Sequence, residues 1–111
     1  MEISRGNIFE LEEIKSDGEE SFETLLESEN LLMEKIITHG KLKSPGKWYD
    51  QKKDEWVMLI QGKATLEFPE DEHIELIKGD YLMIPANVKH RVLKTSKKPD
   101  CIWLALHGKL I

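Results

Sequence analysis

Short apolar runs bounded by turn residues dominate the chain from residue 31 to residue 107. Each run is too short for an independent helix, and several carry β-branched or aromatic side chains, which favour strands. Glycine and proline separate the runs, most clearly at Gly62, Gly79 and Pro85. We expect strands over residues 31–39, 55–61, 63–68, 73–77, 81–84, 88–95 and 101–107. Seven or eight short strands with close turns predict an all-β fold, either an antiparallel sandwich or a barrel.

The first 30 residues have a weaker pattern than the rest of the chain. Residues 21–27 are interpreted as one short helix, with Ser21 as its N-cap and Phe22, Leu25 and Leu26 on one face. We expect a single domain over residues 1–111, in which residues 1–30 form an arm with this helix and residues 31–107 form the barrel. Within the barrel, a tight turn at Gly62 is expected to join residues 55–61 and 63–68 as a hairpin.

Composition limits the classes of partner. The chain has 111 residues, enough for one hydrophobic core, and a net charge of −5. Lysines are scattered among acidic residues rather than gathered in a basic stripe, so we expect no nucleic-acid partner. No apolar run approaches the roughly 20 residues of a membrane helix, and the acidic N-terminus is unlike a signal peptide. The single cysteine, Cys101, cannot form an internal disulfide. We therefore expect a cytoplasmic protein with no membrane partner.

Two stretches of the chain carry a family resemblance. In the first, Glu55 is followed seven residues later by Gly62; in the second, Gly79, Pro85 and His90 follow one another at intervals of six and five residues. These spacings resemble the two conserved motifs of the cupins. The resemblance covers most of residues 31–107 and implies a cupin double-stranded β-helix, or jelly-roll barrel. It further implies a site inside the barrel, in which three histidines and one glutamate hold a divalent metal.

The second motif departs little from the family pattern, whereas the first lacks both histidines. In the second motif, asparagine replaces a glycine at position 87 and lysine replaces an asparagine at position 94. The positions of the His-x-His pair hold Tyr49 and Gln51 with one permitted spacing, and Trp48 and Asp50 with the other. The candidate metal ligands are therefore Glu55, His90, Gln51 and Asp50, for iron, manganese, nickel or zinc. Tyr49 and Trp48 are candidate contacts to a ligand or cofactor.

Two alternatives follow for the interior of the barrel. Glu55 and His90 hold a divalent metal with weaker, oxygen-rich partners, or they hydrogen-bond to each other without one. In the second case the pair still provides a general base near neutral pH, so Glu55 and His90 are the best candidates for catalytic residues. His107 and His39 end strands; His107 could face the mouth of the cavity, but we interpret both as surface or core-edge residues.

The strand over residues 55–61 is apolar on both faces, and a second sheet can cover only one of them. We therefore expect a homodimer. Three functional interpretations stay open: a cupin that binds a small molecule, with or without a metal; a metal-dependent cupin enzyme, such as a dioxygenase or an isomerase of a sugar or small acid; and a binding or structural module without catalysis.

Overall fold

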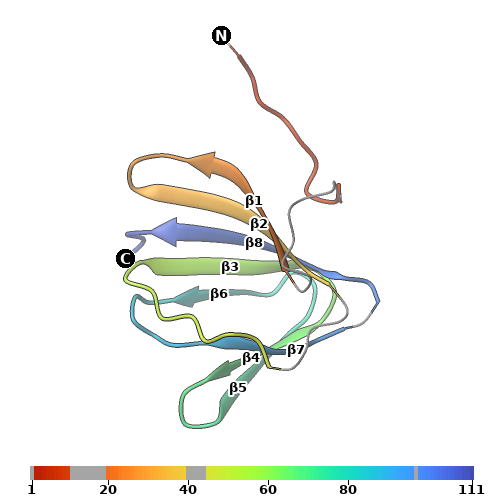
Figure 1. The fold of residues 1–111 in the computed structure, drawn as a ribbon, viewed down its shortest axis with the longest axis vertical. Helices are drawn as coiled ribbons and strands as arrows, with labels where there is room; N and C mark the ends of the chain where they lie inside the picture. The colour runs from red at the N-terminus through yellow and green to blue at the C-terminus, as the bar shows by residue number, and fades with distance from the viewer. Residues whose placement is uncertain (1, 11–19, 40–44, 97) are drawn as a thin grey trace.

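A computed structural model describes residues 2–10, 20–39, 45–96 and 98–111 of the chain. The described residues form eight strands in two sheets that face each other, which confirms the all-β fold (Figure 1). The strands are β1 (Glu20–Glu27), β2 (Leu31–Thr38), β3 (Asp54–Gln61), β4 (Ala64–Phe68), β5 (Glu72–Leu76), β6 (Tyr81–Ile84), β7 (Arg91–Thr95) and β8 (Cys101–Gly108). One sheet has the order β1-β2-β8-β3-β6 and the other β5-β4-β7, with antiparallel neighbours throughout.

The hydrophobic core fills the space between the two sheets. Side chains alternate along a strand, so Val57 and Leu59 of β3 are buried, while Met58 between them is half-buried. Trp103 of β8 and Leu66 of β4 complete the contact between the layers. Each such fully buried side chain stabilises the fold by roughly 1.5–3 kcal/mol relative to its exposed state. The same alternation directs polar side chains of these strands toward the interior.

The predicted helix over residues 21–27 is wrong, because these residues lie in strand β1. This strand pairs antiparallel with β2, from Glu20 opposite Thr38 to Glu27 opposite Leu32, with a bulge before Leu26. A helix of two turns is unstable in water without extensive packing, whereas the free edge of β2 offers a ladder of backbone hydrogen bonds. The extra strand widens the larger sheet and brings its first residues to the interior of the barrel.

The predicted hairpin at Gly62 is also wrong, because β3 and β4 belong to different sheets. Strand β3 instead pairs with β6 and β8. Gly62 forms the corner between the layers with φ +93°, and a Cβ there would lie 2.7 Å from Cys101 Sγ. Glycine is therefore required at this corner for both its backbone conformation and its lack of a side chain.

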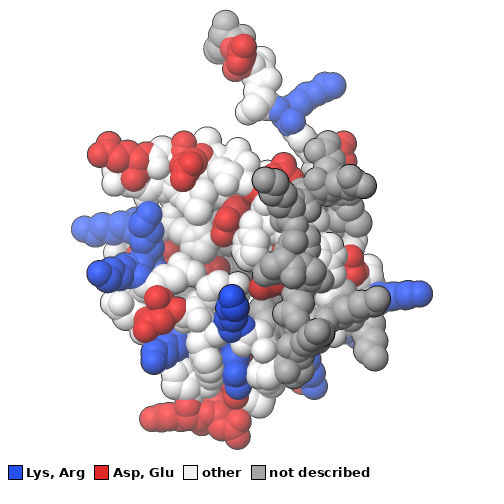
Figure 2. All heavy atoms as spheres, viewed as in Figure 1, with Lys and Arg blue, Asp and Glu red and all other residues white. Residues whose placement is uncertain are grey.

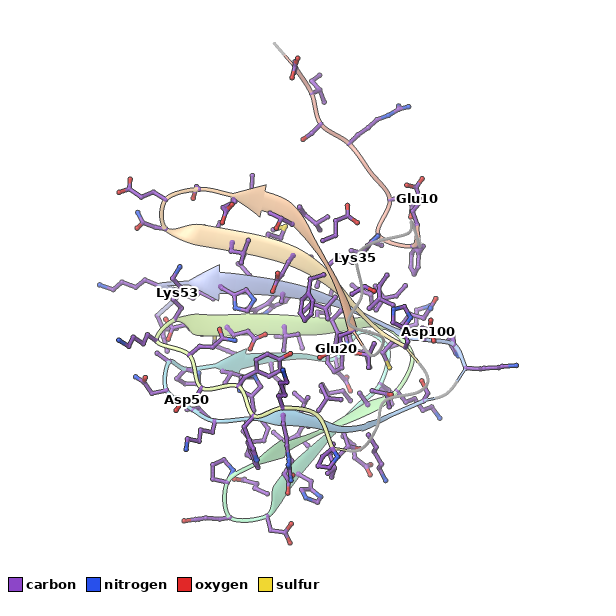
Figure 3. All side chains as sticks on the ribbon, viewed as in Figure 1. Glu10, Glu20, Lys35, Asp50, Lys53 and Asp100 are labelled. Carbon is purple, nitrogen blue, oxygen red and sulfur yellow. The ribbon has the colours of Figure 1, made fainter. Side chains whose placement is uncertain are left out.

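The N-terminal residues lie against the outside of the larger sheet around Lys35. Lys35 of β2 is almost fully buried, and its ammonium group donates a hydrogen bond to the backbone oxygen of Glu10 (Figure 3). It also lies 3.3 Å from the carboxylate of Glu23.

In the space-filling view, acidic and basic side chains are interspersed over the face displayed (Figure 2). None of the described segments is a helix of the length and apolar character needed to cross a membrane.

Candidate functional site

A cavity lies between the two sheets, with about 60 Å³ open to the centres of water molecules. One water needs at least roughly 10–15 Å³, so the space is large enough for more than one water. Four of the residues predicted from sequence line it, namely Glu55, His90, Tyr49 and Gln51. The cavity is therefore the place where the two motifs meet.

Glu55 reaches the cavity because it occupies an inward position near the start of β3. It lies opposite Ile84 of β6 on one side and His107 of β8 on the other. The preceding residue, Asp54, accepts hydrogen bonds from the backbone N–H groups of Ala86 and Leu110, both at 2.9 Å. These bonds, with a third from the C-terminal residue, hold the pKa of Asp54 below its ordinary value. Asp54 thereby fastens both the chain end and the β6–β7 connection beside Glu55.

His90 precedes β7 and is held by backbone pairing with Tyr49. The Tyr49 N–H donates to the His90 carbonyl at 2.7 Å, and the His90 N–H donates back at 3.1 Å. The bend before it depends on Asn87, which has φ +67° and donates its N–H to the Gln51 carbonyl at 2.7 Å. Asparagine is among the residues that best tolerate this left-handed conformation, so it replaces the family glycine here without loss of the bend.

His90 and Glu55 form a buried pair that holds a proton between them. The His90 Nδ1 lies 3.1 Å from the Val88 carbonyl oxygen, which can only accept, so Nδ1 carries a hydrogen. The other ring nitrogen, Nε2, lies 2.9 Å from Glu55 Oε1. One of these two atoms must carry a proton for the contact to be a hydrogen bond. Both residues are less than 10% exposed, at 6% for His90 and 8% for Glu55.

The surroundings of His90 raise its pKa. Burial alone lowers it, because it disfavours the charged imidazolium. The hydrogen bonds that the ring donates to Glu55 and to the Val88 carbonyl, with the negative charge of Glu55, together outweigh burial. The ring is therefore protonated to a higher pH than a free histidine, and it faces the cavity, where it can give a proton to a ligand or take one up.

A second imidazole–carboxylate pair lines the same cavity and was missed by the sequence interpretation. His107 lies 3.0 Å through Nε2 from Glu34 Oε1, and 3.1 Å through Nδ1 from the Gln51 side-chain oxygen. It is 7% exposed, so its interpretation as a surface residue is wrong. The hydrogen bond with Glu34 is the main cause of its raised pKa, against the opposing effect of burial. A carboxylate at an inward position of the apolar run over residues 31–39 was the available signal.

Tyr49 joins the cavity to strand β1. Its hydroxyl donates to Glu20 Oε1 at 3.1 Å, and its ring stacks on His90 at a centroid distance of 5.6 Å. Burial, with the nearby charge of Glu20, raises the pKa of Tyr49 well above its ordinary value. Glu20 also accepts from the Thr38 hydroxyl, which in turn accepts from the indole N–H of Trp103. Tyr49 therefore acts as a neutral hydrogen-bond donor and a wall of the cavity.

Two predicted site residues lie outside the cavity. Trp48, on the connection before β3, is 43% exposed, and the Arg91 guanidinium stacks 4.4 Å from its ring centroid. Asp50 is exposed on the connection before β3, apart from Glu20 at the start of β1 (Figure 3). Neither residue lines the cavity.

The family's metal centre does not fit the donors of this cavity. His90 Nε2 and Glu55 Oε1 lie 2.9 Å apart, but no third histidine, cysteine, aspartate or glutamate of the described residues brings a donor atom within 4.8 Å of both. At the positions of the missing histidines, Tyr49 bonds to Glu20 and Gln51 bonds to His107. Two strong donors fall short of the ligand number that holds a transition metal tightly.

Three possible metal donors do gather elsewhere among the described residues, at the β4–β5 turn. They are Glu67, Asp71 and His73. His73 lies 3.2 Å from Asp71 and 3.6 Å from Glu67, and Glu67 also pairs with Arg91. The cluster is thus an ion-pair network on the surface, away from the cavity.

Comparison with known proteins agrees with the all-β fold of two facing sheets. Residues 36–107 match the sequence profile of the cupin domain. A protein from Ralstonia eutropha JMP134, described as a "putative mannose-6-phosphate isomerase", is 37% identical, with a TM-score of 0.83 over 96% of this chain and 99% of that chain. An RmlC-like cupin protein from Desulfovibrio desulfuricans is 18% identical, with a TM-score of 0.71 over 96% and 97% of the two chains. A search of curated proteins gives no match.

The profile match spans more than half of the 111 residues and contains both motifs. The identity to the Ralstonia protein extends over nearly the whole of both chains. The two facing sheets have the architecture of a jelly-roll barrel. The chain therefore belongs to the cupin family.

Proposed function

We propose that this cupin binds a small polar molecule in the cavity between its sheets, through two imidazole–carboxylate pairs. The observation that carries the proposal is that His90–Glu55 and His107–Glu34 both line one cavity, with His90, Glu55 and His107 buried and Glu34 half-buried. Buried polar groups are costly unless they are hydrogen-bonded, so two such pairs facing the same small space are an unusual way to fill a core. A ligand with hydroxyl or carbonyl groups can exchange hydrogen bonds with both.

A second candidate function is proton transfer within that ligand. The His90–Glu55 pair shares a proton and can act as a general acid or a general base, and His107–Glu34 provides a second group of the same kind. A molecule with a hydroxyl next to a carbonyl is isomerised when a proton leaves the carbon that bears the hydroxyl and is returned to the carbonyl carbon, while the hydroxyl proton passes to the former carbonyl oxygen. That the Ralstonia protein is described as an isomerase supports this candidate.

This proposal uses no metal. A divalent ion held by Glu55 and His90 alone is the competing version, and metal analysis separates the two. Protein purified without an affinity tag and dialysed with iron, manganese, nickel or zinc should retain much less than one ion per chain. A stoichiometric ion that Glu55→Ala and His90→Ala both abolish would favour the metal-dependent enzyme instead.

The cytoplasm is the compartment we propose, since Cys101 is a free thiol.

The binding proposal is tested by a fragment screen with nuclear magnetic resonance. Small polyols, hydroxy-ketones and hydroxy-acids are added to labelled protein, and the shifts of the Trp103 indole and of the two cavity histidines are followed. Binders should shift these signals in the wild type and lose affinity by about tenfold in Glu55→Gln, where one hydrogen-bonding carboxylate is removed. Glu75→Gln on the exposed side of β5 is the matched control. A screen without cavity shifts would leave the non-catalytic structural module as the better interpretation.

The proton-transfer candidate needs a separate assay. Any binder with a hydroxy-carbonyl group is incubated with the protein in deuterium oxide, and incorporation of deuterium at the carbon next to the carbonyl is measured. Incorporation should depend on both pairs, so that Glu55→Gln and Glu34→Gln each slow it by at least about a hundredfold. Binding without deuterium incorporation would reject the enzyme and retain the binding protein.

A further inference from the structure

We propose that the cavity accepts a neutral or cationic ligand and rejects phosphate esters. This inference rests on the proposed function and names the chemical class of its ligand. The inference concerns the charge of the cavity wall, which the family assignment leaves open. The description of the Ralstonia protein as a mannose-6-phosphate isomerase would suggest a phosphorylated ligand, and the inference excludes that ligand for this chain.

The charged groups of the cavity wall are carboxylates and imidazoles. Glu34 and Glu55 face the cavity, and each is already bonded to an imidazole, at 3.0 Å for His107 and 2.9 Å for His90. Among the described lining residues there is no lysine and no arginine. Each imidazole–carboxylate pair is neutral when it holds its shared proton and negative when it loses it. Neither of these two states carries a net positive charge that could attract a phosphate group.

A phosphate placed against either histidine would meet the partner carboxylate as well. Both ring nitrogens of His90 are engaged, by Val88 and Glu55, and both of His107 are engaged, by Gln51 and Glu34. A phosphate oxygen could reach a ring nitrogen only by displacing a carboxylate that stays within a few ångströms of it. Two negative charges at that distance repel strongly beside side chains that are themselves largely buried. Proteins that hold phosphate supply arginine, lysine or free backbone N–H groups instead.

Neutral and cationic groups suit the same wall. A hydroxyl can donate to Glu34 or Glu55 and accept from an imidazole, because it has both a donor and acceptors. An ammonium group gains from Glu34 and Glu55, and from Glu20, which is the third carboxylate of the cavity wall. The cavity is large enough for more than one water, so we expect it to admit only a small ligand.

Three probes with one carbon skeleton and different charge test the inference. Glycerol is neutral, 2-amino-1,3-propanediol is cationic, and glycerol 3-phosphate is anionic. Each is titrated into the full chain at neutral pH in the presence of EDTA, because a stray divalent ion between Glu55 and His90 would reverse the local charge. The readout is the shift of the Trp103 indole N–H, a residue of the cavity wall. The other two indole signals are identified with Trp48→Phe and Trp56→Phe.

Glycerol and the amine should shift the Trp103 signal, and glycerol 3-phosphate should bind at least about tenfold more weakly than glycerol. In Glu34→Gln, which removes a negative charge and keeps the shape, this ratio should fall and the amine should lose affinity. In Glu75→Gln the ratio of the glycerol and glycerol 3-phosphate affinities and the affinity of the amine should stay as in the wild type. The wild-type ratio stands as a test even if Glu34→Gln fails to fold.

Two results would overturn the inference in different ways. If glycerol 3-phosphate binds as tightly as glycerol or more tightly, the charge argument is wrong and the proposed binding cavity is retained. If none of the three probes shifts Trp103, the proposed binding function itself is wrong, and the ligand class is rejected with it.

Discussion

At the residue scale, the molecule places two carboxylates where an all-β core would normally hold aliphatic side chains. Glu55 and Glu34 occupy inward positions of β3 and β2, and each is compensated by a histidine from another strand or connection. A carboxylate that is desolvated without a partner would raise its pKa and become neutral, or would unfold the region around it. The pairs are therefore required by the fold as well as by any ligand.

Glu55→Gln should lower both stability and the pKa of His90. The amide keeps the shape of the side chain but leaves the buried imidazole without its anionic partner, which costs about 1–3 kcal/mol of the free energy of unfolding. Burial then dominates, so His90 should titrate at lower pH than in the wild type. Urea denaturation and the ring proton shifts of His90 measure the two effects. An unchanged His90 titration in a folded variant would contradict the pair geometry.

The contribution of His107 to stability should depend on pH with a defined sign. Its pKa is raised in the folded protein, mainly by the hydrogen bond with Glu34, above the ordinary value near 6.5. Folding therefore favours the protonated ring, so its contribution is complete below about pH 6.5 and is lost as the pH rises through the raised pKa. The stability gap between wild type and His107→Gln should shrink from pH 5.5 to pH 9.

The double variant provides the control for this pH dependence. In a Glu34→Gln background the partner that raises the pKa is absent, so His107→Gln should change stability by a nearly constant amount across the same pH range. Denaturant midpoints at each pH measure the gap. A gap that widens with rising pH would show that the charged ring is not what the fold stabilises.

At the scale of elements, two glycines share a φ of +93°, and substituting each by alanine distinguishes the cost of backbone strain from the cost of side-chain overlap. A Cβ at Gly62 would lie 2.7 Å from Cys101 Sγ, whereas a Cβ at Gly79 would meet nothing within 4 Å. Gly79→Ala should therefore cost only the strain of a left-handed residue, about 1–2 kcal/mol. Gly62→Ala should cost roughly 1–3 kcal/mol more, because the corner between the sheets must shift. Chemical denaturation measures both, and equal losses would contradict the packing at the corner.

Local patterns predicted the strands well, and their pairing poorly. Alternation and turn residues place β3, β6 and β8 within one or two residues of their true bounds. Strand partners depend on contacts between distant residues, so the tight turn expected at Gly62 was taken for a hairpin although it is a corner between layers. The segment of β1 has spacing that suits either a helix or a strand, and only the free edge of β2 decides it.

The residues of the candidate site likewise fall into those that local spacing predicts and those that depend on strand pairing. Glu55 and His90 were predicted from motif spacing, and the structure brings them to 2.9 Å. His107 and Glu34 carry no motif, and they reach the cavity only because β2, β8 and β3 are neighbours in the larger sheet. Residue spacing along the chain contains little of that information. Sequence could have indicated only that a buried carboxylate in β2 requires a partner.

At the scale of the whole molecule, the outward face of the larger sheet is apolar where the N-terminal residues do not contact it. Side chains of β3, β6 and β8 that point away from the barrel are mostly large and hydrophobic. They are Trp56, Met58, Tyr81, Met83, Leu104 and Leu106. Tyr81 is 63% exposed although its ring packs against Trp56 at a centroid distance of 5.6 Å. Contiguous apolar surface of this kind commonly marks a protein interface.

We propose that this face joins two copies of the chain, because a two-fold contact lets one apolar patch bury itself against the same patch of a second copy. Sedimentation at micromolar concentration should give the mass of a dimer. Met58→Lys should yield monomers, since it places a charge at the centre of the patch, whereas Ile77→Lys should leave the dimer intact because Ile77 is exposed on the connection after β5, outside this face. A monomeric wild type, or a Met58→Lys variant that stays dimeric, would assign the contact elsewhere. The side chains of β3 that line the cavity point to the opposite face of the sheet from Met58, so ligand binding by a folded Met58→Lys monomer should match that of the wild type.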